Sequence, residues 1–183
     1  MIRQIFIVLL FTLPLFADAQ DIWMTRSGTI VFHAGTTVEN IDGTNKEVAS
    51  LLNTKTGEIA FNVPVKSFRF TRSLMEEHFN ENYMESTKYP KATFQGKITD
   101  LSKINFAKDG TYKTMVDGEL MMHGATKKIS VPAAITVSQG KISASSSFKV
   151  PLADYNVAIP GVVADKISKE ATIEVNCNYE VKK

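Results

Sequence analysis

The stretch from Ala171 to Val181 (ATIEVNCNYEV) shows most clearly how this chain folds. Apolar side chains occupy every second position, and polar side chains occupy most of the positions between them. The apolar phase consists of Ala171, Ile173, Val175, Cys177, Tyr179 and Val181. Because alternate side chains of a strand point to opposite faces, this pattern predicts a strand with one dry face and one wet face.

The same period of two recurs through most of the chain. Residues 129–137 and 142–150 alternate on either side of Gln139-Gly140, which predicts a hairpin. Further strands are expected at residues 29–34, 59–65, 92–98 and 112–122, whereas residues 40–52 fit a strand or a loop. About eight short strands without a long linker indicate an antiparallel, all-β barrel or sandwich.

The phase of the alternation changes near Lys66-Ser67. The residues before this point share one phase, and Phe68 and Phe70 after it fall in the opposite phase. A slip of one residue turns every later side chain to the other face, so a β-bulge or bend is expected here.

One segment breaks the β pattern and predicts a helix of about three turns. Ser73 and Glu76 have the spacing of a capping box, with Ser73 as N-cap. Apolar side chains then recur at helical spacing up to Tyr83, and Tyr89-Pro90 is expected to end the element. The apolar stripe is expected to cover one open end of the β core and could also line the mouth of an internal cavity.

The first nineteen residues have the pattern of a secretory signal. Arg3 precedes an apolar run from Ile5 to Phe16, and Ala17-Asp18-Ala19 resembles a signal-peptidase site. The run is shorter than the roughly 20 residues that cross a bilayer, although an uncleaved anchor is the alternative. We therefore expect a signal peptide at 1–19, cleavage after Ala19, and one soluble, periplasmic or secreted domain at 20–183.

The residue chemistry favours a binding protein over an enzyme. The three histidines (33, 78 and 123) lack metal-ligand spacing, and we find neither a G-x-S-x-G nucleophile motif nor a phosphate loop. His78 and Cys177 are expected to pack in the core, Cys177 as a small hydrophobe. The net charge of +2, without a dense basic cluster, argues against nucleic acid as a partner. No cofactor, metal or catalytic residue is predicted.

Three segments resemble the YceI-like family. They are residues 77–94, which join the helix to the next strand, residues 117–128 with the pattern G-x-L-x-x-x-G-x-T-K, and residues 148–157, which contain Asp154-Tyr155. The resemblance covers residues 57–181 and implies an extended, lipocalin-like barrel of about eight strands with a short helix near its mouth. It also implies a bacterial envelope protein, and some members of the family hold a polyisoprenoid or another long amphiphile in the barrel. Residues 27–56 match the family pattern poorly, so a shorter or filled cavity is the alternative.

These observations lead to the hypothesis of a carrier for a lipid-like, polyisoprenoid chain. The apolar cavity candidates are Phe61, Val63, Phe68, Phe70, Leu74, Met75, His78, Phe79, Tyr83, Phe94, Val116, Leu120, Phe148 and Tyr155. Transient contact with a membrane or a membrane protein is compatible with this role. One alternative is a ligand-free envelope interaction or stress-response module with a filled core. The other is an enzyme whose site is assembled from distant histidines and carboxylates.

Overall fold

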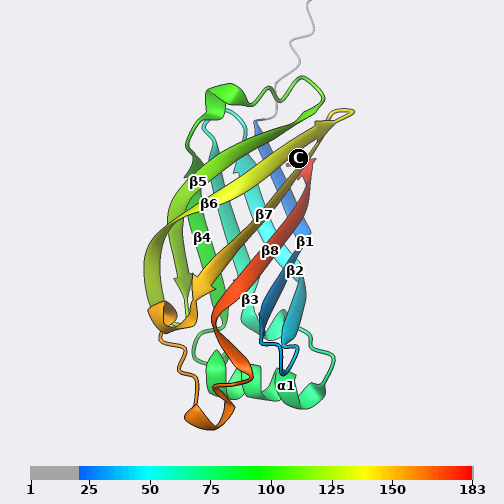
Figure 1. Ribbon diagram of the computed structural model, residues 1–183. Helices are drawn as coiled ribbons and strands as arrows, with labels where there is room; N and C mark the ends of the chain where they lie inside the picture. Colours follow the sequence, from blue (N-terminus) through cyan, green and yellow to red (C-terminus); the bar gives the residue numbers. More distant parts are fainter. Residues whose placement is uncertain (1–20, 183) are drawn as a thin grey trace, which may run out of the picture.

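Eight antiparallel strands pair in chain order, and the last strand pairs with the first, which closes the sheet into a barrel (Figure 1). The computed structural model describes residues 21–182. The strands are β1 (Ile22–Gly35), β2 (Asp42–Asn53), β3 (Glu58–Pro64), β4 (Lys91–Ile98), β5 (Gly110–Met122), β6 (Ala125–Ser138), β7 (Lys141–Pro151) and β8 (Ile167–Val181). The predicted all-β fold is confirmed, and the architecture is a barrel. The expected signal peptide lies outside the described residues.

The hairpin between β6 and β7 forms where the sequence predicts it. Gln139 and Gly140 both have positive φ, at 51° and 72°, as the tight turns that suit twisted hairpins require. Ser138 pairs with Lys141 directly beside this turn, and Ala133 pairs with Ser146 at the other end of the ladder.

The N-terminal strands are longer than the sequence pattern indicates, and their pairing is irregular. β1 begins at Ile22, seven residues before the expected start, but its pairing with β2 shifts register on both sides of Gly28. The ambiguous segment 40–52 is a strand, β2, in which the buried positions include the polar residues Asn45 and Ser50. Bulges and buried polar side chains therefore hide the period of two in this region.

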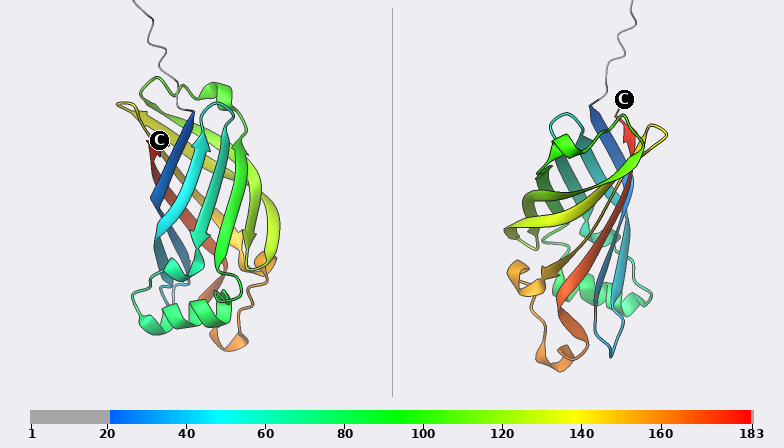
Figure 2. Two further views of the ribbon diagram at one scale, coloured as in Figure 1. Left: turned by 180° about the vertical axis from the view of Figure 1, so that it is seen from behind. Right: turned by 45° about the horizontal axis from the view of Figure 1, so that its top comes forward.

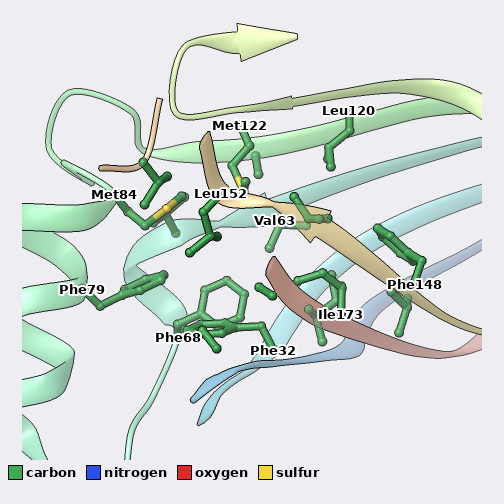
Figure 3. Close-up of a pocket in the computed structure, with 18 of the residues that line it drawn as sticks. Phe32, Val63, Phe68, Phe79, Met84, Leu120, Met122, Phe148, Leu152 and Ile173 are labelled. Carbon is green, nitrogen blue, oxygen red and sulfur yellow. The ribbon is translucent and has the colours of Figure 1, made fainter. Parts of the chain in front are cut away.

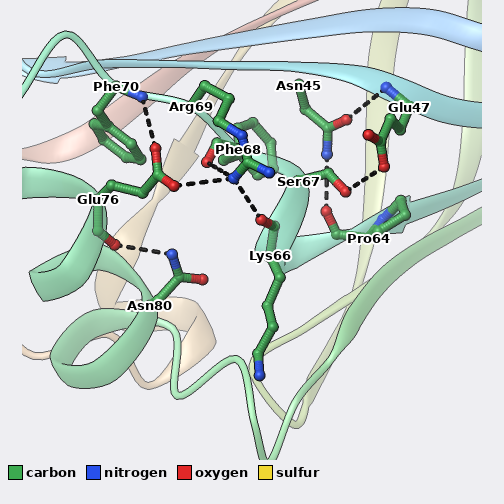
Figure 4. A network of polar contacts seen from close by, with 10 residues as sticks. All are labelled: Asn45, Glu47, Pro64, Lys66, Ser67, Phe68, Arg69, Phe70, Glu76 and Asn80. Atoms are coloured by element: carbon green, nitrogen blue, oxygen red, sulfur yellow. Dashed lines mark hydrogen bonds and ion pairs between the residues drawn. The ribbon is translucent and has the colours of Figure 1, made fainter. Parts of the chain in front are cut away.

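A short 3-10 turn, η1 (Val65–Ser67), produces the expected bend after β3. The buried Asn45 holds this turn, since its side-chain nitrogen donates to the Pro64 carbonyl at 2.8 Å (Figure 4). Its amide oxygen also accepts from the Glu47 N–H at 2.8 Å. After the turn, Thr44 and Arg69 exchange backbone hydrogen bonds, so the chain returns to β2 and places Phe68 and Phe70 at the barrel end.

The predicted helix consists of α1 (Ser73–His78) and a π-helical turn, η2 (Phe79–Tyr83). It lies across one end of the barrel, below the strands in both Figure 1 and the left view of Figure 2. Two details of the prediction are wrong. The N-cap is Arg72 without a side-chain cap bond, because Glu76 accepts from the Phe70 N–H and from Arg69. The helix also ends at Tyr83, since Glu85 adopts a left-handed φ of 42°.

Three further short turns join the strands in the part of the chain that the structure describes. They are η3 (Leu101–Lys103), η4 (Leu152–Tyr155) and η5 (Gly161–Val163). The turns η4 and η5 lie in the connection from β7 to β8, at the same end of the barrel as α1 (Figures 1 and 2). Within residues 21–182, no helix is long and apolar enough to cross a bilayer.

Candidate ligand-binding cavity

The half of the barrel next to α1 encloses a cavity of about 510 Å³ (Figure 3). Inward side chains of every strand except β2 line it, together with residues of α1, η1 and η2. Most of the lining is aliphatic or aromatic, as Phe32, Val63 and Phe148 illustrate in Figure 3. Its volume lies within the roughly 300–1,000 Å³ that small-molecule sites occupy.

The other half of the barrel is filled by side chains. Leu52, Ile98, Ile142 and Tyr179 belong to a packed, buried cluster there, and they do not line the cavity. The Tyr179 hydroxyl and Ser50 Oγ are 2.8 Å apart, so these two buried hydroxyls are hydrogen-bonded to each other. The cavity is therefore closed at this end, and most of its exposed lining residues lie at the α1 end.

Four phenylalanines form the wall of the cavity beside the helix. The ring of Phe79, from η2, stacks on Phe32 with centroids 5.3 Å apart and an interplanar angle of 18°. The same ring lies 5.5 Å from Phe68 and 5.0 Å from Phe70. These spacings are typical of favourable aromatic pairs, so the helix is fixed to the barrel by an apolar contact that also faces the cavity.

The mouth of the cavity carries its charged lining residues. Glu39 comes from the β1–β2 connection, Arg72 precedes α1, and Lys166 precedes β8. Arg72 Nη2 donates to Glu39 Oε1, and Lys166 Nζ lies 3.9 Å from Glu39 Oε2. The hydrogen bond from Arg72 holds the pKa of Glu39 below its usual value, so Glu39 remains a carboxylate at neutral pH.

This closed barrel matches a known family. The family model of the YceI-like domain covers residues 24–179, which is most of the chain. The chain belongs to the YceI-like family. The match includes residues 27–56, and the family resemblance drawn from the sequence is confirmed.

Several solved structures share this fold. A polyisoprenoid binding domain from Saccharophagus degradans, implicated in plant cell wall breakdown, has a TM-score of 0.76 and 14% identity, over 88% of this chain and 99% of its own. Burkholderia cenocepacia BcnA has a TM-score of 0.69 and 14% identity, over 84% of this chain and 96% of its own. The Campylobacter jejuni YCEI protein has a TM-score of 0.58 and 20% identity, over 79% and 88% of the respective chains. No curated protein matches the sequence.

The cavity of this YceI-like domain brings together thirteen of the fourteen predicted site residues. Their inward phase on the strands and their face on the helix explain this gathering. Tyr155 is the exception. It lies on η4, beyond the end of β7, where the strand phase no longer applies, and it is buried outside the cavity lining. Whether the other thirteen bind a ligand stays a prediction.

The environment of His78 also differs from the expectation. His78 was expected to pack in the core, but its side chain is exposed at the C-terminal end of α1, while it still lines the cavity mouth. Leu74 lines the mouth in the same way and is 59% exposed. The first turns of the helix thus form the rim of the opening, and only Phe79 and its neighbours reach the aromatic wall.

Sequence reasoning missed several lining residues on the first and last strands. Ile30 and Phe32 line the cavity from β1, and Ile173 and Val175 line it from β8. The β8 pair belongs to the dry phase that the sequence shows, so the alternation could have identified both residues. The β1 pair follows the register shifts around Gly28, which obscure the phase.

The other two histidines lie outside the cavity lining. His33 contacts Asp42 at 2.7 Å on the exterior of β1. The buried His123 contacts the Tyr155 carbonyl and Glu85, both at 3.0 Å, which ties the loop after η2 to η4. Among residues 21–182, no three histidine, cysteine or acidic side chains gather as metal ligands. The lining of the cavity is mostly apolar, and its charged residues are at the mouth.

Proposed function

We propose that this YceI-like protein binds the hydrocarbon chain of a lipid-like molecule, a polyisoprenoid by preference, inside its barrel. The observation that carries the proposal is the apolar cavity of about 510 Å³, closed at one end by a packed core and reached from the α1 end. Each buried methylene contributes about 0.8 kcal/mol, so a long chain can bind here with few polar contacts. The alternative hypothesis of a ligand-free module requires a core filled by side chains, and the cavity is inconsistent with such a core.

The polyisoprenoid preference is supported by a relative. The Saccharophagus degradans protein that shares this fold is a polyisoprenoid binding domain, although at 14% identity the likeness concerns the fold. The side chains of the cavity provide a binding surface and supply no paired nucleophile and base. Binding without catalysis is therefore the role that we assign to the protein.

A tryptophan in the cavity tests the proposal. Leu120 points into the cavity from β5 (Figure 3). Met115 on the same strand is 40% exposed. Leu120→Trp fills space that the hydrocarbon chain of the ligand needs, whereas Met115→Trp adds the same side chain on the outer face of the barrel. In a titration of delipidated protein with geranylgeraniol, Leu120→Trp should bind at least about tenfold more weakly than wild type, and Met115→Trp should bind as wild type does.

Both variants must first show cooperative thermal unfolding, so that loss of binding is not loss of fold. A folded Leu120→Trp protein that binds geranylgeraniol as tightly as wild type would contradict the proposed site. If wild type binds no geranylgeraniol but binds a straight-chain alcohol, the cavity proposal holds and the isoprenoid preference fails.

We also propose that the protein is exported and that its signal is removed after Ala19. The support is the sequence of residues 1–19, with a basic start, an apolar run and a small-residue cleavage pattern. The exported protein would then act in the periplasm or outside the cell. Its N-terminal sequence should begin at Gln20, and a chain that still begins at Met1 after export would contradict the assignment.

The ligand is proposed to enter from a lipid bilayer that touches the mouth. Val38, Leu74 and Val162 are 62%, 59% and 88% exposed, and they lie on the three segments that surround the opening. These segments are at the same end of the barrel in Figures 1 and 2. The apolar rim is continuous with the cavity, because Leu74 and Val163 line the mouth. Three small apolar side chains give weak, reversible membrane binding.

Vesicle binding tests this contact with a matched control. Replacing Val38, Leu74 and Val162 by serine should abolish cosedimentation with phosphatidylcholine vesicles. Replacing Ile22, Leu51 and Met115, which are 40–41% exposed elsewhere, should leave it unchanged. Equal loss in both triple variants, or no binding by wild type, would refute membrane docking through the mouth. Because charges of both signs lie at this end of the barrel, added salt should have little effect on binding to these vesicles.

A further inference from the structure

The polar groups of the cavity are distributed unevenly. Its charged lining residues (Glu39, Arg72, Lys166 and the titratable His78) belong to the segments that form the mouth. Along the walls the polar lining residues are Tyr83, Thr93, Ser145 and Ser146, which are uncharged. An amphiphile whose chain fills the apolar interior would therefore place its polar end among the charged residues at the mouth.

The cations at the mouth outnumber its carboxylates. One carboxylate, that of Glu39, stands between the guanidinium of Arg72 and the ammonium of Lys166. The neighbouring carboxylate of Glu76 is already used, since it accepts from Arg69 Nη1 at 2.9 Å and from the Phe70 N–H at 3.3 Å (Figure 4). Glu77 and Asp165 are exposed and do not line the cavity. The lining at the mouth thus retains one positive charge beyond what Glu39 neutralises.

The two cations also retain hydrogen-bond donors. Arg72 uses Nη2 on Glu39 and on the sulfur of Met75, and a guanidinium has five N–H groups. Lys166 Nζ, at 3.9 Å from Glu39, lies beyond hydrogen-bond distance, so its three donors are available to a ligand. A group that only accepts hydrogen bonds and carries negative charge fits this arrangement best.

We infer that the mouth is a headgroup subsite for an anionic amphiphile, whose carboxylate or phosphate is bound by Arg72 and Lys166 while its chain occupies the cavity. This inference rests on the proposed function, and it adds the charge of the ligand and its orientation. Glu39 opposes the same headgroup, because its carboxylate repels a second anion and shares the same cations.

Ligands that share the same hydrocarbon chain but differ in their headgroup test the inference. Delipidated protein at about pH 8, where a carboxylic acid is ionised, is titrated with hexadecanoate, hexadecyl phosphate, hexadecanol and hexadecylamine below their micellar concentrations. Wild type should bind one or both anions about fivefold more tightly than the alcohol, the gain expected for an exposed ion pair. The two anions distinguish a carboxylate from a phosphate subsite.

Variants identify the residues responsible. Arg72→Gln and Lys166→Gln should each lower the ratio of anion affinity to alcohol affinity, whereas Glu39→Gln should strengthen anion binding severalfold. Lys108→Gln is the control for net charge, because Lys108 is exposed in the connection from β4 to β5, which lies at the end of the barrel away from α1 (Figure 1). Equal affinity for all headgroups, or weaker anion binding by Glu39→Gln, would overturn the subsite. Failure of every amphiphile to bind would instead refute the proposed function.

Discussion

Cys177 illustrates how a single side chain packs in the filled half of the barrel. Its sulfur lies against β1, where Gly28 has no side chain; a Cβ added there would come within 2.7 Å of that sulfur. The thiol is 2% exposed, and burial raises its pKa from 9.0 to about 11. Burial also raises the pKa of the neighbouring Tyr179 hydroxyl. The prediction that Cys177 packs as a small hydrophobe is confirmed, and the position favours the neutral thiol.

A stability change at alkaline pH follows from this burial. The folded state holds the thiol proton more tightly than the unfolded state. The contribution of this proton to the free energy of unfolding is therefore complete below about pH 9 and is lost as the pH rises toward about 11. Between pH 8 and pH 10, the free energy of unfolding of wild type should fall by about 1 kcal/mol more than that of Cys177→Ala. Urea unfolding of both proteins at the two pH values measures this difference.

Thiol labelling provides an independent check on Cys177. A disulfide reagent should leave the native protein unmodified at about pH 8 and should modify one thiol per chain in urea, since the reactive form is the thiolate. Rapid labelling of the native protein would mean that the thiol is accessible, contrary to the structure.

At the scale of elements, the sequence predicts best those strands whose buried face is uniformly apolar. The hairpin β6–β7 and the strand β8 could be predicted because Ile135, Val137, Ile142 and Cys177 keep a strict phase. β2 could not, because its buried positions include Asn45 and Ser50, whose partners lie on other elements. The capping-box prediction was wrong for a related reason, since Glu76 bonds Arg69, a residue that only the fold brings near.

Asn45 therefore has a testable structural role. It is fully buried and joins the irregular part of β2 to the Pro64 carbonyl, which fixes η1 and hence Phe68 (Figure 4). Asn45→Ala leaves buried backbone groups without partners and should lower the free energy of unfolding by about 1–3 kcal/mol. Asn62→Ala, at an exposed position of β3, should change it by less than about 0.5 kcal/mol. Equal effects in urea unfolding would show that the Asn45 bonds contribute nothing specific.

At the scale of the whole molecule, the barrel divides into a filled half and a hollow half. Strand phase and the apolar face of the helix predict which side chains point inward, and for this reason thirteen predicted residues line the cavity. Phase does not reveal whether inward side chains meet one another, because that depends on their volumes and on the barrel diameter. The charged mouth was also beyond sequence reasoning, since Glu39, Arg72 and Lys166 are far apart in the chain and meet only through the fold.

The central claim is that the hollow half holds a hydrocarbon chain, and extraction of the native protein tests it most directly. Wild type, Leu120→Trp and Met115→Trp would be purified without detergent from cells that export them, extracted with organic solvent and examined by mass spectrometry. Wild type and Met115→Trp should release a long-chain lipid, with an isoprenoid chain if the proposed preference is right, in amounts approaching one per protein, and Leu120→Trp should release little. Absence of lipid from wild type, or equal amounts from all three folded proteins, would contradict the claim.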